Sequence, residues 1–327
     1  MSRAEQFLLG SGHSPAAVQV GLLNNMPDAQ LRTTELRFAR LLKDACGGLD
    51  VRLRLFSLGS IPRSDETRMR MAGFYDDAAF MEAAGLDALI VTGTVSDSTD
   101  LAAEPYWKEL TQRIDWAENG TLSTLFSGLA SAAAVRHLSG IAPRPAKLLG
   151  VYASRRAQDD PLFFNSAPLL PMPHARRHDL AERELSAAGY RVLARLDSKN
   201  GEEESVDIFT RETPGQSRFV FLQGHPEYDP NTLARLYLQD MERFLAGETK
   251  EPPPIPHNYF DRATEDRLAA VRGHSGLSAY QAVLANALPR QVWHPHMVRL
   301  IGNWLTLVAA AKARRTATRA VRTRRRA

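Results

Sequence analysis

His225 and Glu227 have the residue types and the spacing of a general base and the carboxylate that orients it. They come directly after Phe219–Leu222, an apolar run that predicts a buried strand. A loop at the end of a buried strand holds its side chains in fixed positions, so this pair could take a proton from a hydroxyl or a thiol. The same spacing is common in loops that only cap a structure, and further residues are needed to decide between the two interpretations.

Residues Leu122–Leu138 have the pattern of a nucleophile elbow, in which a sharp turn between a buried strand and a helix lifts one side chain above the helix N-terminus. The amide groups of that N-terminus can stabilise an oxyanion. The turn is Ser127-Gly128, so the nucleophile position falls on one of these two residues. Gly128 has no side chain, and Ser127, one residue earlier, is expected to direct its hydroxyl away from the site.

Apolar runs that alternate with helical segments must position these residues. The predicted strands are Val18–Leu23, Val51–Leu58, Ala88–Val91, Leu122–Phe126 and Phe219–Leu222, and the predicted helices run from about Thr33 to Ala45, Pro105 to Glu118, Leu129 to Leu138 and Asn231 to Leu245. Repeated strand–helix pairs predict an α/β fold with a mainly parallel sheet and helices on both faces. Ligands in such folds bind beyond the carboxyl ends of the strands, where the loops 24–28, 92–97 and 224–229 and the elbow would lie.

We expect one α/β domain over residues 18–250, preceded by an N-terminal segment at 1–17. The proline-rich Glu251–Pro256 ends this domain, and residues 251–311 are predicted to be a helical extension that packs on it. Residues 312–327 contain eight basic residues and no acidic one, so the formal net charge of +4 leaves residues 1–311 with −4. We expect this basic run to be a disordered tail that does not contact nucleic acid.

Composition excludes several classes of protein. The single cysteine, Cys46, rules out a disulfide framework and a cysteine-based metal site and favours a cytoplasmic setting. His294 and His296 have a metal-like spacing without neighbouring cysteine or carboxylate ligands, so no metal site is predicted. The longest apolar stretch, 304–311, is too short to cross a bilayer, and no association with a membrane is expected.

Several segments occur in the order found in the homoserine O-succinyltransferases and O-acetyltransferases of methionine biosynthesis, and the chain resembles that family over about residues 18–310. These segments are Val20–Pro27, Leu89–Gly93, Tyr106-Trp107, Ser123–Phe126, Lys147–Tyr152, Pro173-His174, Gly224–Asp229 and Gly302-Asn303-Trp304. The resemblance implies a three-layer fold of the class I glutamine amidotransferase (flavodoxin-like) type. It also implies acyl-CoA as co-substrate with no bound cofactor, and a Cys–His–Glu triad whose cysteine passes the acyl group to homoserine.

Matched residue by residue, the resemblance makes His225 the base, Glu227 its orienting acid and Lys147 a residue that holds the amino-acid substrate. It also places the family's nucleophilic cysteine at Gly128. Without that thiolate the covalent route of the family is closed, because glycine offers no nucleophile.

Other positions of the resembling pocket differ as well. Ala175 replaces a serine that contacts the substrate, Gln239 an arginine expected to hold the carboxylate of homoserine, and Ala29 a lysine near the oxyanion. Asp97 falls where the family tunes the choice of acyl group, and its charge would repel the free carboxylate of a succinyl group and favour acetyl.

Two functions stay open. The first is an acyl-CoA-dependent O-acyltransferase for homoserine or a related hydroxylated amino acid, in which either His225 activates the acceptor hydroxyl directly or Ser127 is the nucleophile. The second is a non-catalytic paralogue that keeps the fold as a binding or regulatory partner. The resemblance implies a homodimer, and a non-catalytic chain would instead pair with an active homologue.

Overall fold

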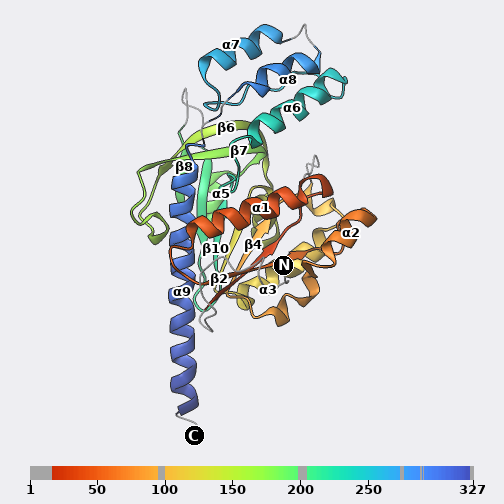
Figure 1. Ribbon diagram of the computed structural model, residues 1–327. Helices are drawn as coiled ribbons and strands as arrows, with labels where there is room; N and C mark the ends of the chain where they lie inside the picture. The colour runs from red at the N-terminus through yellow and green to blue at the C-terminus, as the bar shows by residue number, and fades with distance from the viewer. Residues whose placement is uncertain are drawn as a thin grey trace.

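The computed structural model describes residues 17–94, 100–197, 205–272, 276–287, 289 and 291–324. Within these ranges, ten strands form one sheet (Figure 1). Their order across the sheet is β3 (Tyr75–Asp77), β2 (Val51–Ser57), β1 (Val18–Leu23), β4 (Ala88–Thr92), β5 (Ser123–Ser127), β10 (Arg218–Leu222), β9 (Val206–Arg211), β8 (Arg191–Leu196), β6 (Arg144–Arg156) and β7 (Leu169–Asp179).

Neighbouring strands from β3 to β10 are parallel, which confirms the predicted α/β fold with a mainly parallel sheet. Every residue of β4 and of β5 is buried, as expected of strands covered on both faces. The remaining strands, β9, β8, β6 and β7, are antiparallel to their neighbours and were not predicted from the sequence. They extend the sheet on the side of β10.

Helices cover both faces of the sheet, so the architecture has three layers. On one face, α1 (Asp28–Ala45) and α9 (His294–Arg324) pack on residues such as Val20 and Ile90. On the other face, α3 (Trp107–Gly120) and α4 (Leu129–Ser139) pack on residues such as Val91. Helix α1 begins at Asp28 rather than at the predicted Thr33, because Pro27 occupies the cap position and an acidic residue follows in the first turn.

Shorter elements fill the remaining connections. They are α2 (Asp65–Met71), α5 (Glu182–Ala187) and the single-turn helices Ala78–Phe80, Glu82–Ala84, Leu101–Ala103 and Pro161–Phe163. Helices α6 (Thr232–Leu245), α7 (Arg262–Val271) and α8 (Leu277–Ala285) form a group above the carboxyl ends of the parallel strands (Figure 1). Tyr237, Leu268 and Tyr280 join this group to the same core cluster as β1.

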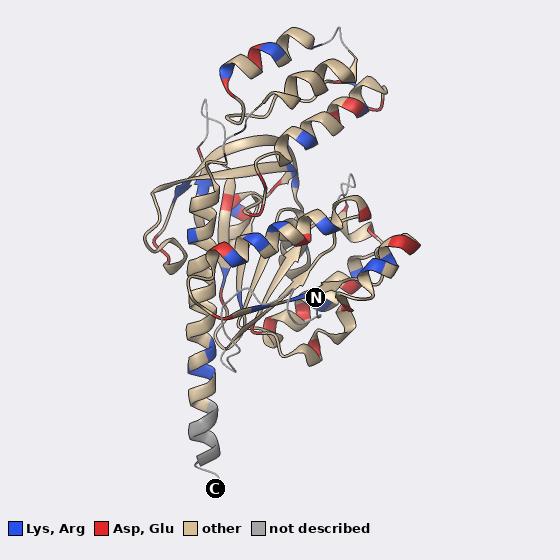
Figure 2. Ribbon diagram, in the orientation of Figure 1, with Lys and Arg blue, Asp and Glu red and all other residues tan. Residues whose placement is uncertain are grey.

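The basic segment from Lys312 onward is helical, so the predicted disordered tail is wrong as far as Arg324. Helix α9 packs on the sheet with Trp304 and Val308 and then projects beyond the body of the molecule (Figure 1). Lys312 and Arg315 bind the buried carboxylate of Asp87, at 2.7 and 3.3 Å. Figure 2 shows basic residues on the part of α9 that leaves the body. Through these ion pairs the basic segment contacts the folded domain, whereas a disordered basic segment would contact only solvent. Among the described residues, no helix is long and apolar enough to span a membrane.

Candidate active site

The carboxyl ends of three neighbouring strands bring the predicted loops together. Thr92 of β4 is in register with Ser127 of β5, and Ser127 is in register with Leu222 of β10. The loop after β4, the elbow after β5 and the loop with His225 therefore start at the same edge of the sheet, as expected for a parallel α/β fold. A cavity of about 570 Å³ opens there, and its wall includes Gly93, Gly128, Lys147, His225, Glu227 and Gln239.

His225 and Glu227 form the predicted pair. Nδ1 of His225 lies 3.0 Å from Oε1 of Glu227, and the side chains of the two residues are 18% and 6% exposed. A buried carboxylate next to Nδ1 favours the tautomer that carries its proton there and leaves Nε2 to accept one. The backbone N–H of His225 donates to the carbonyl of Pro173 at 2.9 Å, which fixes the loop to β7.

Gly128 adopts the backbone geometry of an elbow. Its dihedral angles are φ 60° and ψ −128°, a region that glycine enters without strain. Hydrogen bonds hold the elbow in place, because Ser131 Oγ donates to the carbonyls of Phe126 and Leu222 at 2.9 and 3.0 Å. A Cβ built at position 128 would lie 2.5 Å from Cε1 and 2.9 Å from Nε2 of His225. The position therefore directly faces the imidazole, as the position of a nucleophile must.

Ser127 is the buried last residue of β5, and its side chain contacts Glu227. Its hydroxyl donates to Oε2 of Glu227 at 3.4 Å. A hydroxyl that points at Glu227 supports the carboxylate, and this contact disfavours the alternative in which Ser127 is the nucleophile.

The residues predicted to bind substrate surround the same cavity. Lys147 on β6, Ala175 on β7, Gln239 on α6 and Ala29 on α1 all contribute to its wall. Asp97 lies outside the described residues. No group of three or more potential metal ligands occurs in the part of the chain that the structure describes.

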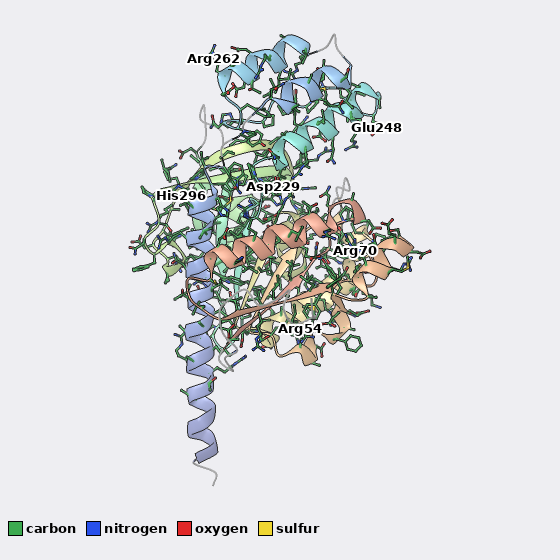
Figure 3. The ribbon with its side chains drawn as sticks, viewed as in Figure 1. Arg54, Arg70, Asp229, Glu248, Arg262 and His296 are labelled. Atoms are coloured by element: carbon green, nitrogen blue, oxygen red, sulfur yellow. The ribbon has the colours of Figure 1, made fainter. Side chains whose placement is uncertain are left out.

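Arginines that the sequence analysis did not single out also line the cavity, and carboxylates neutralise them. Arg37 of α1 and Arg235 of α6 both bind Asp229, at 2.9 and 2.7 Å, and Figure 3 shows Asp229 in the region between these helices. Arg177 binds Asp240 at 3.0 Å. Asp229 lies 192 residues from Arg37, and Asp240 lies 63 residues from Arg177, so no local pattern marks these two arginines.

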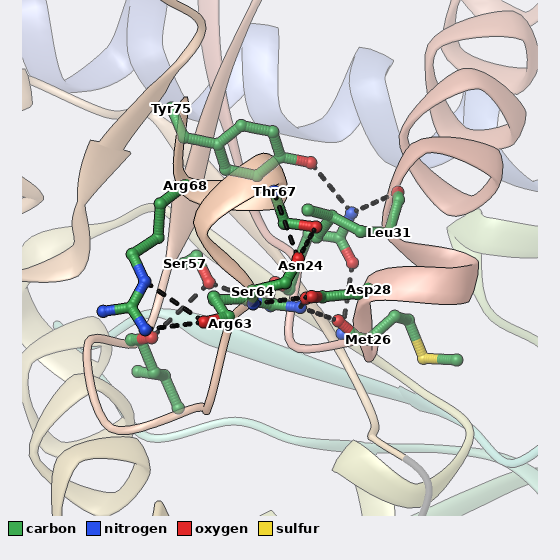
Figure 4. Close-up of polar contacts among 11 residues, drawn as sticks. Asn24, Met26, Asp28, Leu31, Ser57, Arg63, Ser64, Thr67, Arg68 and Tyr75 are labelled. Carbon is green, nitrogen blue, oxygen red and sulfur yellow. Dashed lines mark hydrogen bonds and ion pairs between the residues drawn. The ribbon is translucent and has the colours of Figure 1, made fainter. Parts of the chain in front are cut away.

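The loop after β1 is held by one buried arginine that the sequence analysis also missed (Figure 4). Arg63 donates to the carbonyl of Met26 at 2.5 Å, to Asp28 at 3.2 Å and to Ser57 Oγ at 3.1 Å. Asn24 Nδ2 donates to the carbonyl of Leu31 at 2.9 Å. These bonds fix the segment that carries Met26 and Ala29 on the wall of the cavity.

A polar pair lies beneath the loop that carries His225. His174 Nε2 is 3.4 Å from Asp207 Oδ1, and both side chains are fully buried. Burial, with smaller effects of Arg176 and His225, lowers the pKa of His174 well below its ordinary value. Burial raises the pKa of Asp207 to about 6, against hydrogen bonds and the charge of Arg176 that act to lower it. Gln223 joins this pair to the loop, because its N–H donates to the carbonyl of Asp207 at 2.9 Å.

Fold and site together define a three-layer α/β protein with an elbow and an acid-oriented histidine at the carboxyl edge of the sheet. A solved glutamine amidotransferase from Thermotoga maritima is similar over 91% of this chain and 99% of its own, with a TM-score of 0.48 and 12% identity. Residues 11–314 match the family model described as homoserine O-succinyltransferase. The chain belongs to the homoserine O-succinyltransferase family, which confirms the resemblance found in the sequence.

Two curated relatives show how far the similarity extends. The homoserine O-succinyltransferase of Rhodopseudomonas palustris is 45% identical over 270 residues, covering 82% of this chain and 79% of the relative. That of Methylorubrum extorquens is 44% identical over 301 residues, covering 89% and 87%.

Proposed function

We propose that this protein is a homoserine O-acyltransferase in which His225 acts directly on the acceptor, without an acyl-enzyme. The observation that carries the proposal is the 3.0 Å contact between His225 Nδ1 and Glu227 beside a glycine elbow. The names of its relatives support homoserine as acceptor and the transfer of an acyl group to its oxygen. The acyl-CoA thioester as donor follows from the resemblance of the sequence to that family. The oriented imidazole supports a proton transfer, and Gly128 leaves no side chain to carry an acyl group.

In the proposed step, Nε2 of His225 takes the proton of the acceptor hydroxyl as its oxygen attacks the thioester carbonyl. The oxyanion that forms accepts a hydrogen bond from the backbone N–H of Leu129, the residue after the elbow. When the intermediate collapses, the C–S bond breaks and the imidazolium returns the proton to the thiolate of CoA. The products are the O-acyl amino acid and free CoA, so atoms and charge balance.

Lys147 is the proposed anchor for the carboxylate of the amino acid. It lies on the wall of the cavity, whereas Arg37, Arg177 and Arg235 are already bound to carboxylates. The transferred acyl group could be succinyl or acetyl. The relatives are named for succinyl transfer, and Asp97 of this chain predicts acetyl instead, because a carboxylate would repel succinyl.

The second candidate is a non-catalytic chain that binds homoserine or CoA and pairs with an active homologue. The observation that favours it is again Gly128, because removing the nucleophile of a triad alone can abolish most of its contribution to catalysis. A homodimer stays a prediction for the acyltransferase, pairing with an active homologue is the prediction for the non-catalytic chain, and a cytoplasmic location stays a prediction under either function.

The test is release of thiol from acetyl-CoA and from succinyl-CoA, with homoserine or serine as acceptor. We expect the unmodified protein to turn over and His225→Ala to lose at least a hundredfold in kcat, since a general base typically contributes 10²–10⁴. Initial rates at varied concentrations of both substrates should give intersecting lines, as for a ternary complex. Parallel lines would indicate an acyl-enzyme, and substrate binding without turnover would support the binding partner.

A further inference from the structure

We propose that Tyr228 and Arg37 are positioning residues that hold the imidazole of His225 in the space a side chain at position 128 would need. Glycine is then a requirement of this site, and restoring a cysteine alone does not restore the triad. The kinetic consequence rests on the proposed function, whereas the position of the imidazole does not.

A stack of three side chains fixes the histidine. The rings of His225 and Tyr228 are parallel within 7°, with centroids 4.3 Å apart. The guanidinium of Arg37 lies 5.6 Å from the centroid of the Tyr228 ring and binds Asp229 at 2.9 Å. Because a cation is attracted to the face of an aromatic ring, Arg37 restrains Tyr228 and thereby the imidazole.

The backbone of Tyr228 is held as firmly as its ring. Its carbonyl accepts the indole N–H of Trp293 and the amide of Gln291, both at 2.9 Å. Trp293 is fully buried and precedes α9. These hydrogen bonds hold the loop in place, so the imidazole of His225, which belongs to the same loop, stays close to Gly128.

Position 128 leaves no room for a side chain while the imidazole remains there. The distances of 2.5 and 2.9 Å from a Cβ to Cε1 and Nε2 are shorter than real contacts of such atoms. A residue with a Cβ at 128 would have to push the ring away from Tyr228 or Glu227, or would itself be displaced from φ 60°. In either case the base loses its present relation to the elbow.

Variants of Gly128, Tyr228 and Arg37 separate these roles. Gly128→Ala introduces the Cβ alone, and Gly73→Ala is the matched control, because nothing lies within 4 Å of a Cβ at 73 and its φ is not positive. Tyr228→Leu removes the stacking ring, and Tyr228→Phe keeps it. Arg37→Gln removes the cation from the far end of the stack.

The readout that does not depend on activity is the ¹⁵N and ¹H resonances of the His225 imidazole, assigned by comparison with His225→Gln. We expect Gly128→Ala and Tyr228→Leu to shift these resonances and Tyr228→Phe and Gly73→Ala to leave them in place. In the acyl-transfer assay, Tyr228→Leu and Arg37→Gln should lower kcat about tenfold with KM changed less than threefold, and Tyr228→Phe should restore the rate. Circular dichroism and thermal unfolding identify any variant that fails to fold.

Gly128→Cys gives the sharpest contrast. Incubated with acetyl-CoA or succinyl-CoA, it should show no acyl adduct by intact mass and a rate below that of the unmodified protein. An acyl adduct with faster turnover, or unchanged His225 resonances in both Gly128→Ala and Tyr228→Leu, would overturn the inference. If the unmodified protein turns over no acyl-CoA, the proposed function fails, and the resonances still decide whether the stack holds the imidazole.

Discussion

Gly93 lies against the backbone of Leu129 at the start of α4. A Cβ at position 93 would be 2.8 Å from the Cβ of Leu129, which is closer than such atoms pack, and 3.1 Å from its nitrogen, which is shorter than most such contacts. The amide of Leu129 is the proposed donor to the oxyanion, so the missing side chain of Gly93 keeps that donor accessible.

We therefore expect Gly93→Ala to lower kcat for acyl transfer by about tenfold to a hundredfold, because removing one oxyanion donor costs 10²–10³ in kcat and a methyl group would block it only in part. The KM for homoserine should change little. Gly73→Ala is again the control with open space around its Cβ. Wild-type kcat in Gly93→Ala would argue against Leu129 as the donor.

Ser127 offers a test of covalent against supporting roles. Its hydroxyl donates to Glu227 at 3.4 Å, a single weak hydrogen bond. Ser127→Ala should therefore lower kcat about fivefold, corresponding to the ~1 kcal/mol that such a bond contributes. A loss of a thousandfold or more, together with an acyl adduct on Ser127 in the unmodified protein, would make this residue the nucleophile.

Lys147 should control the binding of the acceptor. Lys147→Ala is expected to raise the KM for homoserine about tenfold to a hundredfold, since hydrogen bonds to charged groups contribute about 1.5–3 kcal/mol. The KM for the acyl-CoA should change much less. The exposed Lys43 at the end of α1, outside the cavity, provides the control Lys43→Ala. Equal effects of the two substitutions would show that net charge rather than a contact is responsible.

The parallel strands other than β3, and the proximity of His225 to Glu227, were predictable because their signals are local. Strands β4 and β5 are buried at every residue, and an uninterrupted apolar run records that burial directly. Strand β6 instead has exposed and buried positions in an irregular order and a register shift against β7, which leaves no clear period in the sequence.

What positions the site depends on distant pairings and was not predictable. Arg37 meets Asp229 across 192 residues, and Lys312 meets Asp87 across 225. Neither pair leaves a mark in the local pattern of charges. The same reason explains why the basic end of the chain was expected to be disordered although α9 extends through it.

Asp87 should stabilise the contact between the sheet and the part of α9 that carries Lys312 and Arg315. Its side chain is 3% exposed and accepts Lys312 at 2.7 Å, Arg315 at 3.3 Å and the backbone N–H of Gln19 at 2.9 Å. Asp87→Ala leaves the half-buried Lys312 without its carboxylate, and breaking such a pair costs about 3 kcal/mol of unfolding free energy. Urea denaturation measures this loss.

A double-mutant cycle with Lys312→Ala separates the ion pair from other effects of Asp87. We expect a coupling free energy of about 1 kcal/mol or more, because residues in direct contact are not additive. Additive losses would mean that Lys312 and Asp87 stabilise the fold independently.

Asp207 should give the stability of the fold an unusual dependence on pH. Burial raises its pKa from 3.8 to about 6, so between these pH values the folded protein keeps a proton that the unfolded chain loses. The stability that this proton provides is complete below pH 4 and is lost as pH rises through 6, on the order of 3 kcal/mol in all. Buried His174 acts in the opposite direction, because its pKa is lowered and its folded form resists protonation as pH falls below 6.5.

Asp207→Asn removes the first contribution and keeps the second. Relative to the unmodified protein, the variant should therefore gain unfolding free energy between pH 4 and pH 7, as measured by urea denaturation at several pH values. Asp28→Asn is a control whose difference from the unmodified protein should stay nearly constant between pH 4 and pH 7, because Asp28 is largely ionised in the folded and unfolded chain over that range. Burial acts to raise the pKa of Asp28, but hydrogen bonds from Ser64, Thr67 and Arg63 lower it to about 2, so its stabilisation is lost as pH falls through that value. A stability difference between Asp207→Asn and the unmodified protein that does not change with pH would show that Asp207 is ionised throughout this range.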